Sequence, residues 1–399
     1  MKILVLNTRV NTIDFELYEM PQEKQLCKGI VERVGMDTAM ITYCTPQLKD
    51  EHIAVLSVLD HQQAVDTILK IITTSPYGVL KNTNEIDAIG HRVVHGGEKY
   101  FESVLITHEV KQGIHGNIEL APLHNPFNLK GIEEIEKELP GKPQVAVFDT
   151  AFHQTLPESA YRYPISDRIY QQTKVRKYGF HGISHRYVTE RTSLLLKKPV
   201  KKLNIISIHL GQGSSLCAIK NGVSVDTSMG LTPIDGLMMM TRSGSISPSI
   251  ILHLSKSGMS LNDIDSMLNR ESGVFGISGV SDAMIDNIRE MNAGNKKAKL
   301  AINMFVYRVK SYIGSYSVLF DKLDAICFTG GIGENADIIR KMVCEGLKNL
   351  GIGIDLSKNK KANGRETAVN KPNSKVKILV IPRDETILIA RDTYKLVKK

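Results

Sequence analysis

The sequence predicts an α/β protein made of two related halves. Short apolar runs, which are typical of buried strands, alternate with longer stretches that have helical periodicity. A strand, a polar turn and a second strand are predicted at residues 2–20, and the same arrangement recurs at residues 204–219. This recurrence indicates a duplication, with one sheet in each half and a cleft between the halves.

In the first half, residues 2–7 are expected to form an apolar strand, and a turn at 8–11 leads into a second strand at 12–20. Two strands joined by so short a turn predict a hairpin. Three further elements are expected: a strand at 86–94, a helix at 128–139 with one apolar face, and a buried strand at 145–148.

In the second half, two strands flank the polar turn Gly211–Gly213, and Asn221-Gly222 is a strong signal for the next hairpin turn. The chain then returns through residues 223–227. The remaining elements are expected in this order: a long helix at 296–320, a buried strand at 325–328, a glycine-rich turn at 330–333, a helix at 335–350, a solvated lysine-rich loop at 357–376, a strand at 376–381 and a helix at 385–397.

The amino-acid composition and net charge indicate which kinds of substrate and partner to expect. The 399 residues are enough for two domains, and 42% hydrophobic with 23% charged residues is typical of a globular protein. The net charge of +9 suits small anionic substrates, although lysine-rich surfaces are more often simply solvated. Because aromatic residues make up only 6% and no recognised module is present, nucleic acid is not an expected partner.

The sequence also predicts where the protein works. No run approaches the ~20 apolar residues of a membrane span, and no secretory signal pattern is present. The cysteines have no CxxC or zinc spacing: Cys27, Cys44, Cys217, Cys327 and Cys344. We therefore expect a cytoplasmic protein with unreactive thiols and no membrane partner.

Asp149 directly follows the strand predicted at 145–148. In α/β proteins, functional side chains collect where such strands end. A strand-end aspartate more often caps the turn through backbone amides, which is the simpler interpretation. Polar clusters at residues 91–97, 124–128 and 180–185 shift the balance toward a functional site.

Arg92 and Arg242 each lie beside a glycine-rich turn. An arginine fork binds phosphoryl oxygens through two hydrogen bonds and stays charged, whereas either arginine alone would more often form a surface ion pair. Together with Asp149 and Glu385, the two arginines would supply an anion clamp and magnesium partners for phosphoryl transfer.

Two glycine-rich segments, Gly211–Gly213 and Gly330–Gly333, follow apolar strands. Such turns present backbone N–H groups to phosphate, but glycines also serve ordinary tight turns, so both alternatives stay open on this pattern. Neither segment is a P-loop or a dinucleotide fingerprint. His181 and His185 have the i, i+4 spacing of a zinc pair, yet no third ligand is evident and a zinc site is not expected. The run Met238–Met240 is expected in the core.

Seven collinear stretches resemble the acetate kinase family. They are HRVVHGG (91–97), APLHNP (121–126), VFDTAFHQTLP (147–157), YGFHGISHRYV (178–188), DTSMGLTP (226–233), FTGGIGEN (328–335) and IARDT (389–393). The resemblance implies two duplicated RNase H-like domains of the actin-like ATPase fold, hinge closure around an interdomain nucleotide cleft, and a homodimer. The expected domains are 1–149, completed by the helix 385–399, and 150–384.

The resemblance also implies a reaction: direct in-line transfer of a phosphoryl group from ATP to acetate, assisted by Mg²⁺ or Mn²⁺. Arg92 and Arg242 resemble the residues that hold the carboxylate and the transferring group. His181 resembles the residue that stabilises charge in flight, Asp149 the essential carboxylate, and His124 another catalytic histidine. The further assignments are Asn7 and Glu385 for the metal, Val94, Leu123, Phe180 and Pro233 for the acetate methyl, and Asn7, His209, Gly211, Gln212, Gly213, Gly330, Gly331, Ile332, Gly333 and Asn335 for the nucleotide.

Several residues depart from the family pattern on the nucleotide side. The first hairpin of the family usually reads Asn-x-Gly-Ser-Ser-Ser-x-x-Lys, whereas this chain has Arg9, Val10 and Asp14 there. The other departures are Gln212 for an asparagine, Ala283 and Ile285 for an aspartate and an arginine, and Ser245 and Ser247 for two aspartates. Three hypotheses follow: an ATP-dependent acetate kinase with a modified nucleotide site, a kinase that uses another donor such as pyrophosphate, and a non-catalytic paralogue.

Overall fold

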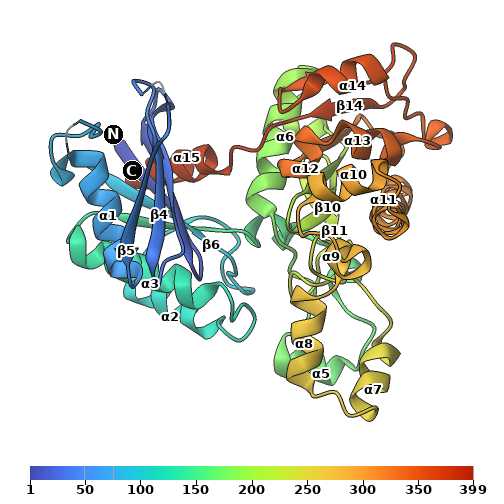
Figure 1. Cartoon of the computed structure of the whole chain (residues 1–399), viewed down its shortest axis with the longest axis horizontal. Coiled ribbons are helices and arrows are strands. Elements are labelled where there is room, and N and C mark those ends of the chain that lie inside the picture. The colour runs from blue at the N-terminus through green and yellow to red at the C-terminus, as the bar shows by residue number, and fades with distance from the viewer. Residues whose placement is uncertain (49, 75, 399) are drawn as a thin grey trace. The chain divides into compact units, whose positions relative to one another are not determined.

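The chain forms two compact units, which are described one at a time. In this computed structural model, which describes residues 1–48, 50–74 and 76–398, unit 1 comprises Met1–Ala151 with Asp384–Lys399, and unit 2 comprises Phe152–Arg383. Each unit has its own mixed sheet with helices packed around it (Figure 1). The α/β class predicted from the sequence is therefore confirmed.

Unit 1 is built on an eight-stranded sheet of order β5-β4-β3-β2-β1-β6-β8-β7. Its strands are β1 (Lys2–Thr8), β2 (Thr12–Glu19), β3 (Lys24–Glu32), β4 (Met36–Cys44), β5 (His52–Val58), β6 (Ala88–Val93), β7 (Val104–Leu105) and β8 (Gln144–Phe148). β1 and β2 pair antiparallel along their whole lengths, which confirms the predicted hairpin. β6 runs parallel to β1, and β8 runs parallel to β6.

Helices cover this sheet. They are α1 (His61–Thr73), α2 (His108–Gly116), α3 (Asn125–Glu138) and α15 (Glu385–Val397), with a short 3-10 helix η1 (Thr83–Glu85). α15 comes last in the chain yet packs on β1, β6 and β8. This close approach depends on Gly90 in β6, because a Cβ atom there would lie 2.5 Å from Thr393 Oγ1 and 2.6 Å from Ile389 Cγ2.

Unit 2 has a six-stranded sheet of order β11-β10-β9-β12-β14-β13. Its strands are β9 (Ile205–Leu210), β10 (Ser214–Lys220), β11 (Val223–Thr227), β12 (Ala325–Thr329), β13 (Thr367–Ala368) and β14 (Lys377–Val380). β9, β10 and β11 form antiparallel hairpins as predicted, whereas β12 runs parallel to β9 and β14 runs parallel to β12.

Six strands of each unit share one topology. The order β3-β2-β1-β6-β8-β7 in unit 1 corresponds to β11-β10-β9-β12-β14-β13 in unit 2, with antiparallel and parallel pairs in the same places. The duplication indicated by the sequence is therefore present in both sheets. In each, three parallel strands bring their carboxyl ends to one edge of the sheet, where functional groups can meet.

The helices of unit 2 surround its sheet. They are η2 (Ala151–Thr155, which begins at the last residue of the first segment of unit 1), α4 (Glu158–Tyr161), α5 (Asp167–Thr173), α6 (Gly182–Leu196), η3 (Val200–Lys202), α7 (Pro248–Lys256), α8 (Leu261–Arg270), α9 (Gly273–Ser278), α10 (Met284–Asn292), α11 (Lys296–Ser317), α12 (Gly330–Asn335), α13 (Asp337–Cys344), η4 (Lys348–Leu350) and α14 (Leu356–Ala362). α11 is the predicted long helix. Its Phe305 belongs to the same core cluster as Met238 and Met240, so the predicted burial of the methionine run is confirmed.

The region after β12 differs from the prediction. The expected turn at 330–333 is instead the start of α12, and the expected helix at 335–350 is shorter, because α13 ends at Cys344. Between the two helices, Ala336 has φ −91° and ψ 84°, which interrupts the helical hydrogen-bond ladder. Small residues in this stretch favour a turn locally, but the helix that they form is held at its end by a side chain of α13.

That side chain is Arg340, which is fully buried. Its Nη1 donates to the carbonyl oxygens of Gly333 and Glu334, both at 2.8 Å, and so satisfies the end of α12. Its Nε donates to Asn359 Oδ1 at 2.8 Å. Asn359 lies in α14, so the prediction of a loop at 357–376 is wrong: the segment contains α14 and β13.

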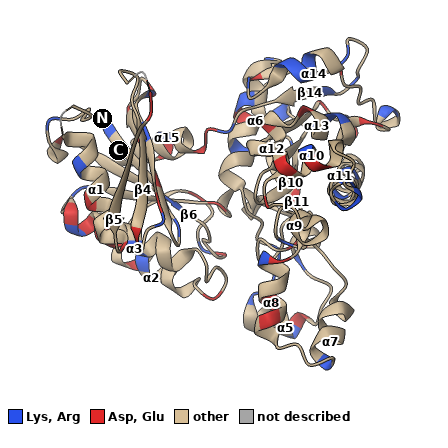
Figure 2. Cartoon of the chain, in the orientation of Figure 1, with Lys and Arg blue, Asp and Glu red and all other residues tan. Residues whose placement is uncertain are grey.

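The lysines of this segment nevertheless face solvent. Lys358, Lys360 and Lys361 are exposed on α14, where Figure 2 shows a basic stretch. This agrees with the interpretation that much of the positive charge of the chain is solvated surface rather than a binding groove.

Two further features concern the environment of the protein. Among the described residues, no helix is long and apolar enough to cross a membrane. Burial raises the pKa of Cys27, Cys327 and Cys344 to about 12 in each case. Because the thiolate is the reactive form, these thiols are poor nucleophiles at neutral pH.

Replacing Gly90 with Ala is expected to lower the free energy of unfolding by about 1–3 kcal/mol, because the added methyl group forces α15 away from β6. Urea unfolding followed by circular dichroism measures the effect. Gly116→Ala is the matched control, since no atom lies within 4 Å of its added Cβ, and its change is expected to stay within about 0.5 kcal/mol. Equal effects of the two substitutions would contradict the close packing of α15.

Candidate functional site

The first group of candidate residues lies at the carboxyl ends of β1, β6 and β8 in unit 1. Arg92, near the end of β6, donates from Nη2 to Asp149 Oδ2 at 2.5 Å. Its Nη1 donates to Asn7 Oδ1 at 3.2 Å. Its Nε lies 4.0 Å from Oε2 of Glu385, the first residue of α15. Four residues that the sequence analysis assigned to one site are therefore close together.

Burial and neighbouring charges shift the pKa of Arg92 in opposite directions. Burial of the guanidinium acts to lower its pKa, but the carboxylates of Asp149 and Glu385 outweigh burial and raise it. Asp149 is only 1% exposed, so its contact with Arg92 is a largely buried ion pair. The alternative that Asp149 contacts only backbone amides is wrong.

The first hairpin carries a pair of opposite charges. Asp14 on β2 lies opposite Asn7 on β1 and accepts a hydrogen bond from Asn7 Nδ2 at 3.1 Å. Arg9, in the turn, also donates to the carboxylate of Asp14. Two of the three departures from the family pattern in this hairpin therefore compensate each other, because the negative charge of Asp14 is matched by Arg9.

The polar clusters around β6 and at the start of α3 are brought together. Asn128 Oδ1 accepts from the N–H of Val94 at 3.0 Å, and Asn125 Oδ1 accepts from the N–H of His95 at 3.1 Å. Burial lowers the pKa of His95 to about 4, so the ring is neutral at pH 7. These residues hold the backbone that follows Arg92 in place.

Two other predicted residues of unit 1 lie just before α3. His124 is half-buried at the N-cap position of this helix. Leu123 is 45% exposed, whereas Val94 is buried. Of these two predicted apolar residues of unit 1, one is thus exposed and the other is buried.

The second group gathers around Gly213 in unit 2, in the turn between β9 and β10. A Cβ atom at Gly213 would lie 3.1 Å from Arg242 Nη2 and 3.3 Å from His181 Nε2. His181 immediately precedes α6 in a left-handed conformation with φ 57°. Its ring stacks on that of His209, with centroids 4.2 Å apart. Four predicted residues therefore adjoin one small volume within unit 2.

Arg242 is a cation without a carboxylate partner among the residues that the structure describes. Its Nη1 donates to the carbonyl oxygen of Pro233 at 2.8 Å. Burial lowers the pKa of the Arg242 guanidinium below its usual value. In contrast to Arg92, the charge of Arg242 is not neutralised by any described carboxylate, and this makes its surroundings complementary to an anion.

The two glycine-rich segments lie next to each other in unit 2, because β12 runs parallel to β9. Gly330 has φ 78°, and a Cβ atom there would lie 2.6 Å from the carbonyl oxygen of Leu210. Only glycine permits both this conformation and this close approach. The residues predicted to bind nucleotide, at 211–213 and 330–333, thus share one edge of the sheet.

The other predicted residues of unit 2 differ in exposure. Phe180 is buried just before α6, and Gln212 is exposed in the turn after β9. Gly331 and Asn335 are exposed on α12, where Asn335 Nδ2 donates to the carbonyl oxygen of Gly331 at 2.9 Å. Ile332 packs against the core of unit 2.

Two serines that were not predicted as site residues contact the histidines. Ser215 Oγ is 2.8 Å from both His181 Nδ1 and His185 Nε2. Ser207 Oγ is 2.8 Å from His185 Nδ1. Both serines are fully buried in mostly apolar strands, and a buried hydroxyl needs a hydrogen-bond partner. Their position within the strands predicted at 204–219 is the signal that could have identified them.

Comparisons with known proteins identify the family. The model of the Acetokinase family matches residues 2–391. The chain belongs to the acetokinase family. This acetokinase is 49% identical over 401 residues to an acetate kinase of Caldicellulosiruptor saccharolyticus, with 100% of both chains covered.

Solved structures agree with this membership. The acetokinase is similar to acetate kinase of Porphyromonas gingivalis, with a TM-score of 0.94 and 42% identity over 99% of both chains. It is also similar to a propionate kinase from Francisella tularensis subsp. tularensis SCHU S4, with a TM-score of 0.93 and 40% identity over 99% of both chains.

Replacing Gly213 with Ala in this acetokinase is expected to displace Arg242 and His181, because the methyl group would crowd a nitrogen atom of each. Each nitrogen must give way by a few tenths of an ångström. Because a misplacement of about 1 Å can cost about 100-fold in turnover, we expect a loss of severalfold in kcat. Steady-state kinetics and thermal melting, measured together, separate this loss from unfolding. Gly314→Ala in α11 adds a methyl group with no neighbour within 4 Å and should keep parental kinetics. Parental turnover in the Gly213 variant would contradict the convergence around this residue.

Proposed function

We propose that this acetokinase is an acetate kinase, which transfers the terminal phosphoryl group of ATP to acetate and forms acetyl phosphate and ADP reversibly. The observation that carries the proposal is Arg242, a cation that lacks a carboxylate partner within the described part of the chain and lies beside His181. Such a pair of donors is complementary to a carboxylate or a phosphoryl group. Membership of the acetokinase family supports acetate as the acceptor.

In this proposal, Arg92 binds the oxygens of acetate and of the transferred group. Its Nε has no hydrogen-bond partner among the described residues, while its Nη2 is held by Asp149 at 2.5 Å. Acetate needs no general base because it is already an anion at neutral pH. The rate therefore comes from in-line positioning and from neutralisation of charge on the transferred group.

Magnesium fits the oxygen ligands of unit 1. Within the described residues, no cluster of three or more histidine, cysteine or acidic side chains could hold a metal by itself. Mg²⁺ does not require one, since it commonly binds through one or two carboxylates, water and the phosphates of the substrate. Asn7 and Glu385, both next to Arg92, would hold it, and Mn²⁺ accepts the same ligands. When bound, the ion neutralises charge on the phosphates.

The remaining roles in phosphoryl transfer and nucleotide binding are assigned mainly to residues near Gly213. His181 and Arg242 donate to the phosphoryl group in flight, and His124 assists as a further catalytic histidine. The glycine-rich segments that follow β9 and β12, together with His209 and Asn335, hold the nucleotide.

The methyl group of acetate is assigned to Val94, Leu123, Phe180 and Pro233. A related protein is a propionate kinase, and one extra methylene in an apolar pocket changes the binding energy by only about 1–3 kcal/mol. Propionate is therefore the competing acceptor to measure.

The departures from the family pattern bear on which molecule donates the phosphoryl group. Ala283 and Ile285, at the start of α10, offer no polar group for a nucleoside, and Ile285 is 72% exposed. Pyrophosphate would need no such contact, which makes it the second candidate donor. The ion pair of Arg9 and Asp14 conserves charge balance in the first hairpin and so favours a working site over the non-catalytic alternative.

The deciding experiment measures acetyl phosphate, trapped with hydroxylamine, after purified protein is incubated with Mg²⁺ and either acetate or propionate. Parallel reactions contain ATP, other nucleoside triphosphates or pyrophosphate. We expect turnover with ATP and acetate. Arg242→Ala should lower kcat by orders of magnitude, because it removes an interaction made mainly in the transition state. Asp149→Asn should also lower kcat, because it removes the carboxylate charge that holds Arg92.

The donors separate the three hypotheses. If the protein turns over with pyrophosphate but not with ATP, the phosphoryl donor is pyrophosphate and the proposal of ATP as the donor is wrong. No turnover with any donor, from protein whose thermal melting shows it to be folded, would favour the non-catalytic paralogue. Near-parental turnover of the Arg242 variant would refute the role of that residue.

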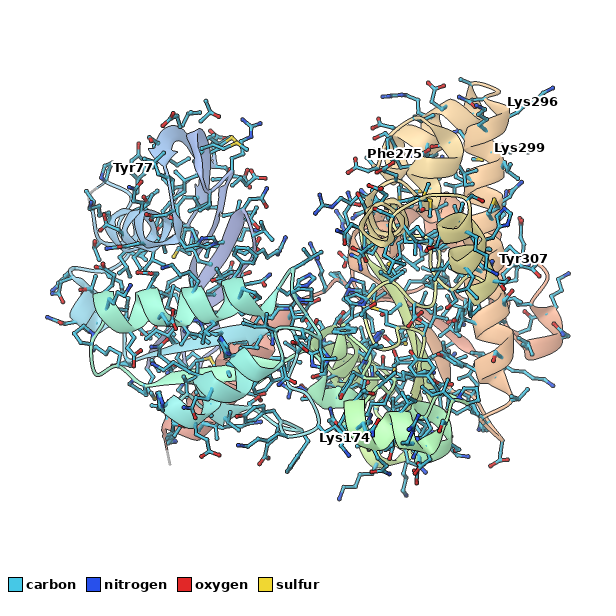
Figure 3. The ribbon with its side chains drawn as sticks, turned by 90° about the horizontal axis from the view of Figure 1, so that it is seen from below. Tyr77, Lys174, Phe275, Lys296, Lys299 and Tyr307 are labelled. Atoms are coloured by element: carbon cyan, nitrogen blue, oxygen red, sulfur yellow. The ribbon has the colours of Figure 1, made fainter. Side chains whose placement is uncertain are left out.

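We also propose that the acetokinase is a homodimer formed through unit 2. Phe275 on α9 and Tyr307 on α11 are 38% and 67% exposed, and these two helices pack together. Figure 3 shows Tyr307 on the same helix as Lys296 and Lys299. Apolar side chains on such a surface suit burial in an interface.

Size-exclusion chromatography with light scattering should give twice the mass of one chain. Tyr307→Glu is expected to shift the population toward monomer, since it introduces a charge into the interface. The control Val55→Glu changes an exposed apolar residue of unit 1 and should leave the mass unchanged. A single-chain mass for the parent protein would contradict the proposal.

A further inference from the structure

Two histidines and two serines form a continuous hydrogen-bonded series in unit 2, here termed the His–Ser chain. His181 Nδ1 is 2.8 Å from Ser215 Oγ, which is 2.8 Å from His185 Nε2. His185 Nδ1 is in turn 2.8 Å from Ser207 Oγ. The two histidines lie four residues apart at the start of α6, Ser207 belongs to β9 and Ser215 belongs to β10.

Three members of the His–Ser chain are removed from water, since His185, Ser207 and Ser215 have no exposed surface. Burial lowers the pKa of His185 well below its ordinary value, and the neighbouring rings of His153 and His209 lower it further. His185 is therefore neutral at pH 7. A neutral imidazole has one N–H donor and one acceptor nitrogen.

The hydrogens of the chain can be placed by counting donors. If the hydroxyl of Ser207 donates to His185 Nδ1, then His185 Nε2 carries the N–H and donates to Ser215. The hydroxyl of Ser215 then donates to His181 Nδ1. In this order, every donor between Ser207 and His181 has an acceptor.

In the opposite order, one hydroxyl hydrogen has no acceptor among the described residues. Ser207 would accept from His185, and its own hydroxyl hydrogen would have no acceptor among the described residues. An unsatisfied buried donor costs about 1–3 kcal/mol. The first order, in which hydrogen bonds run from Ser207 toward His181, is therefore favoured.

We propose that Ser207, His185 and Ser215 are positioning residues that hold His181 in the tautomer with its hydrogen on Nε2. In this tautomer, Nδ1 accepts from Ser215 and Nε2–H is a donor on the side of Gly213, where Arg242 Nη2 also lies. Both donors can then bind one anion. The other tautomer would present a lone pair to that anion. The proposed role rests on the proposed phosphoryl transfer, in which His181 donates to the group in flight.

Histidine rings and a cation lie around the ring of His181. Its ring stacks on His209, the ring of His185 lies 6.5 Å away, and Arg242 lies near its Nε2. The ring of His153 lies 5.6 Å from that of His185. A second proton on His181 would add charge beside Arg242 and would also require Nδ1–H, which reverses the whole His–Ser chain.

Nuclear magnetic resonance of the full-length protein with ¹⁵N-labelled histidine measures the tautomer directly and needs no substrate. In the parent protein we expect the His181 signals of a single tautomer with Nε2–H. Ser215→Ala breaks the chain and should give the averaged signals of two tautomers. A wrong histidine tautomer costs serine hydrolases about 10⁴-fold in kcat, and we expect a loss of at least about tenfold here with little change in KM for acetate.

A rescue variant separates hydrogen bonding from packing. His185→Gln keeps an N–H that can donate to Ser215, so it should retain the Nε2–H tautomer of His181 and most of the turnover. His185→Met has a similar size without a donor and should lose both. These variants keep the test decisive if Ser215→Ala does not fold.

Ser224→Ala is the matched control, because it removes another fully buried serine hydroxyl, which lies 2.9 Å from His153 Nδ1 outside the His–Ser chain. It should leave the His181 tautomer and kcat at parental values. Two results would overturn the inference. One is a parent protein in which His181 carries its hydrogen on Nδ1, and the other is a Ser215 variant in which His181 keeps the pure Nε2–H tautomer. If the parent protein shows no turnover with any donor, the proposed function fails, while the tautomer measurement still decides the role of the chain.

Discussion

A guanidinium that is removed from water needs a counter-charge, and the two arginines of this acetokinase meet that need differently. Arg92 has its counter-charges inside unit 1, in Asp149 after β8 and Glu385 at the start of α15. The parallel strands and the last helix must all be in place for this cluster to form. Among the described residues, Arg242 has a carbonyl oxygen as its partner and no carboxylate, so a bound anion would compensate its burial. In the proposed function, Arg92 is thus fixed before the substrate arrives, and Arg242 attracts the substrate.

Much of the fold could be predicted because its strands are apolar runs bounded by turns. The hairpin at the amino terminus and the helix at 385–397 agree with the structure. The errors cluster around one side chain. Arg340 contacts the end of α12, seven residues before it, and Asn359 of α14, 19 residues after it, and hydrophobic periodicity contains no sign of such contacts. Glycines at 330–333 therefore indicated a turn where the structure has a helix.

The candidate site, like the fold, could be predicted only in part. Residue types and motifs indicated Arg92, Asp149, His181 and Arg242, because phosphoryl transfer needs those groups. Partnerships between side chains depend on strand register, which sequence alone specifies poorly. The match of Arg9 with Asp14 became visible only once β1 and β2 were paired. For the same reason, the sequence marks Ser207 and Ser215 only as hydroxyls within mostly apolar strands and does not show which histidines they contact.

The position of α15 has a consequence for how the protein is made. This helix packs on β1, β6 and β8 and carries Glu385 at its first residue, yet Asp384–Lys399 follow all of Phe152–Arg383 in the chain. Domains generally fold during synthesis in the order in which they leave the ribosome. Here unit 1 emerges first but stays without its covering helix until unit 2 has been translated. During that interval the apolar face of its sheet is open to chaperones, and the cluster around Arg92 lacks one of its carboxylates.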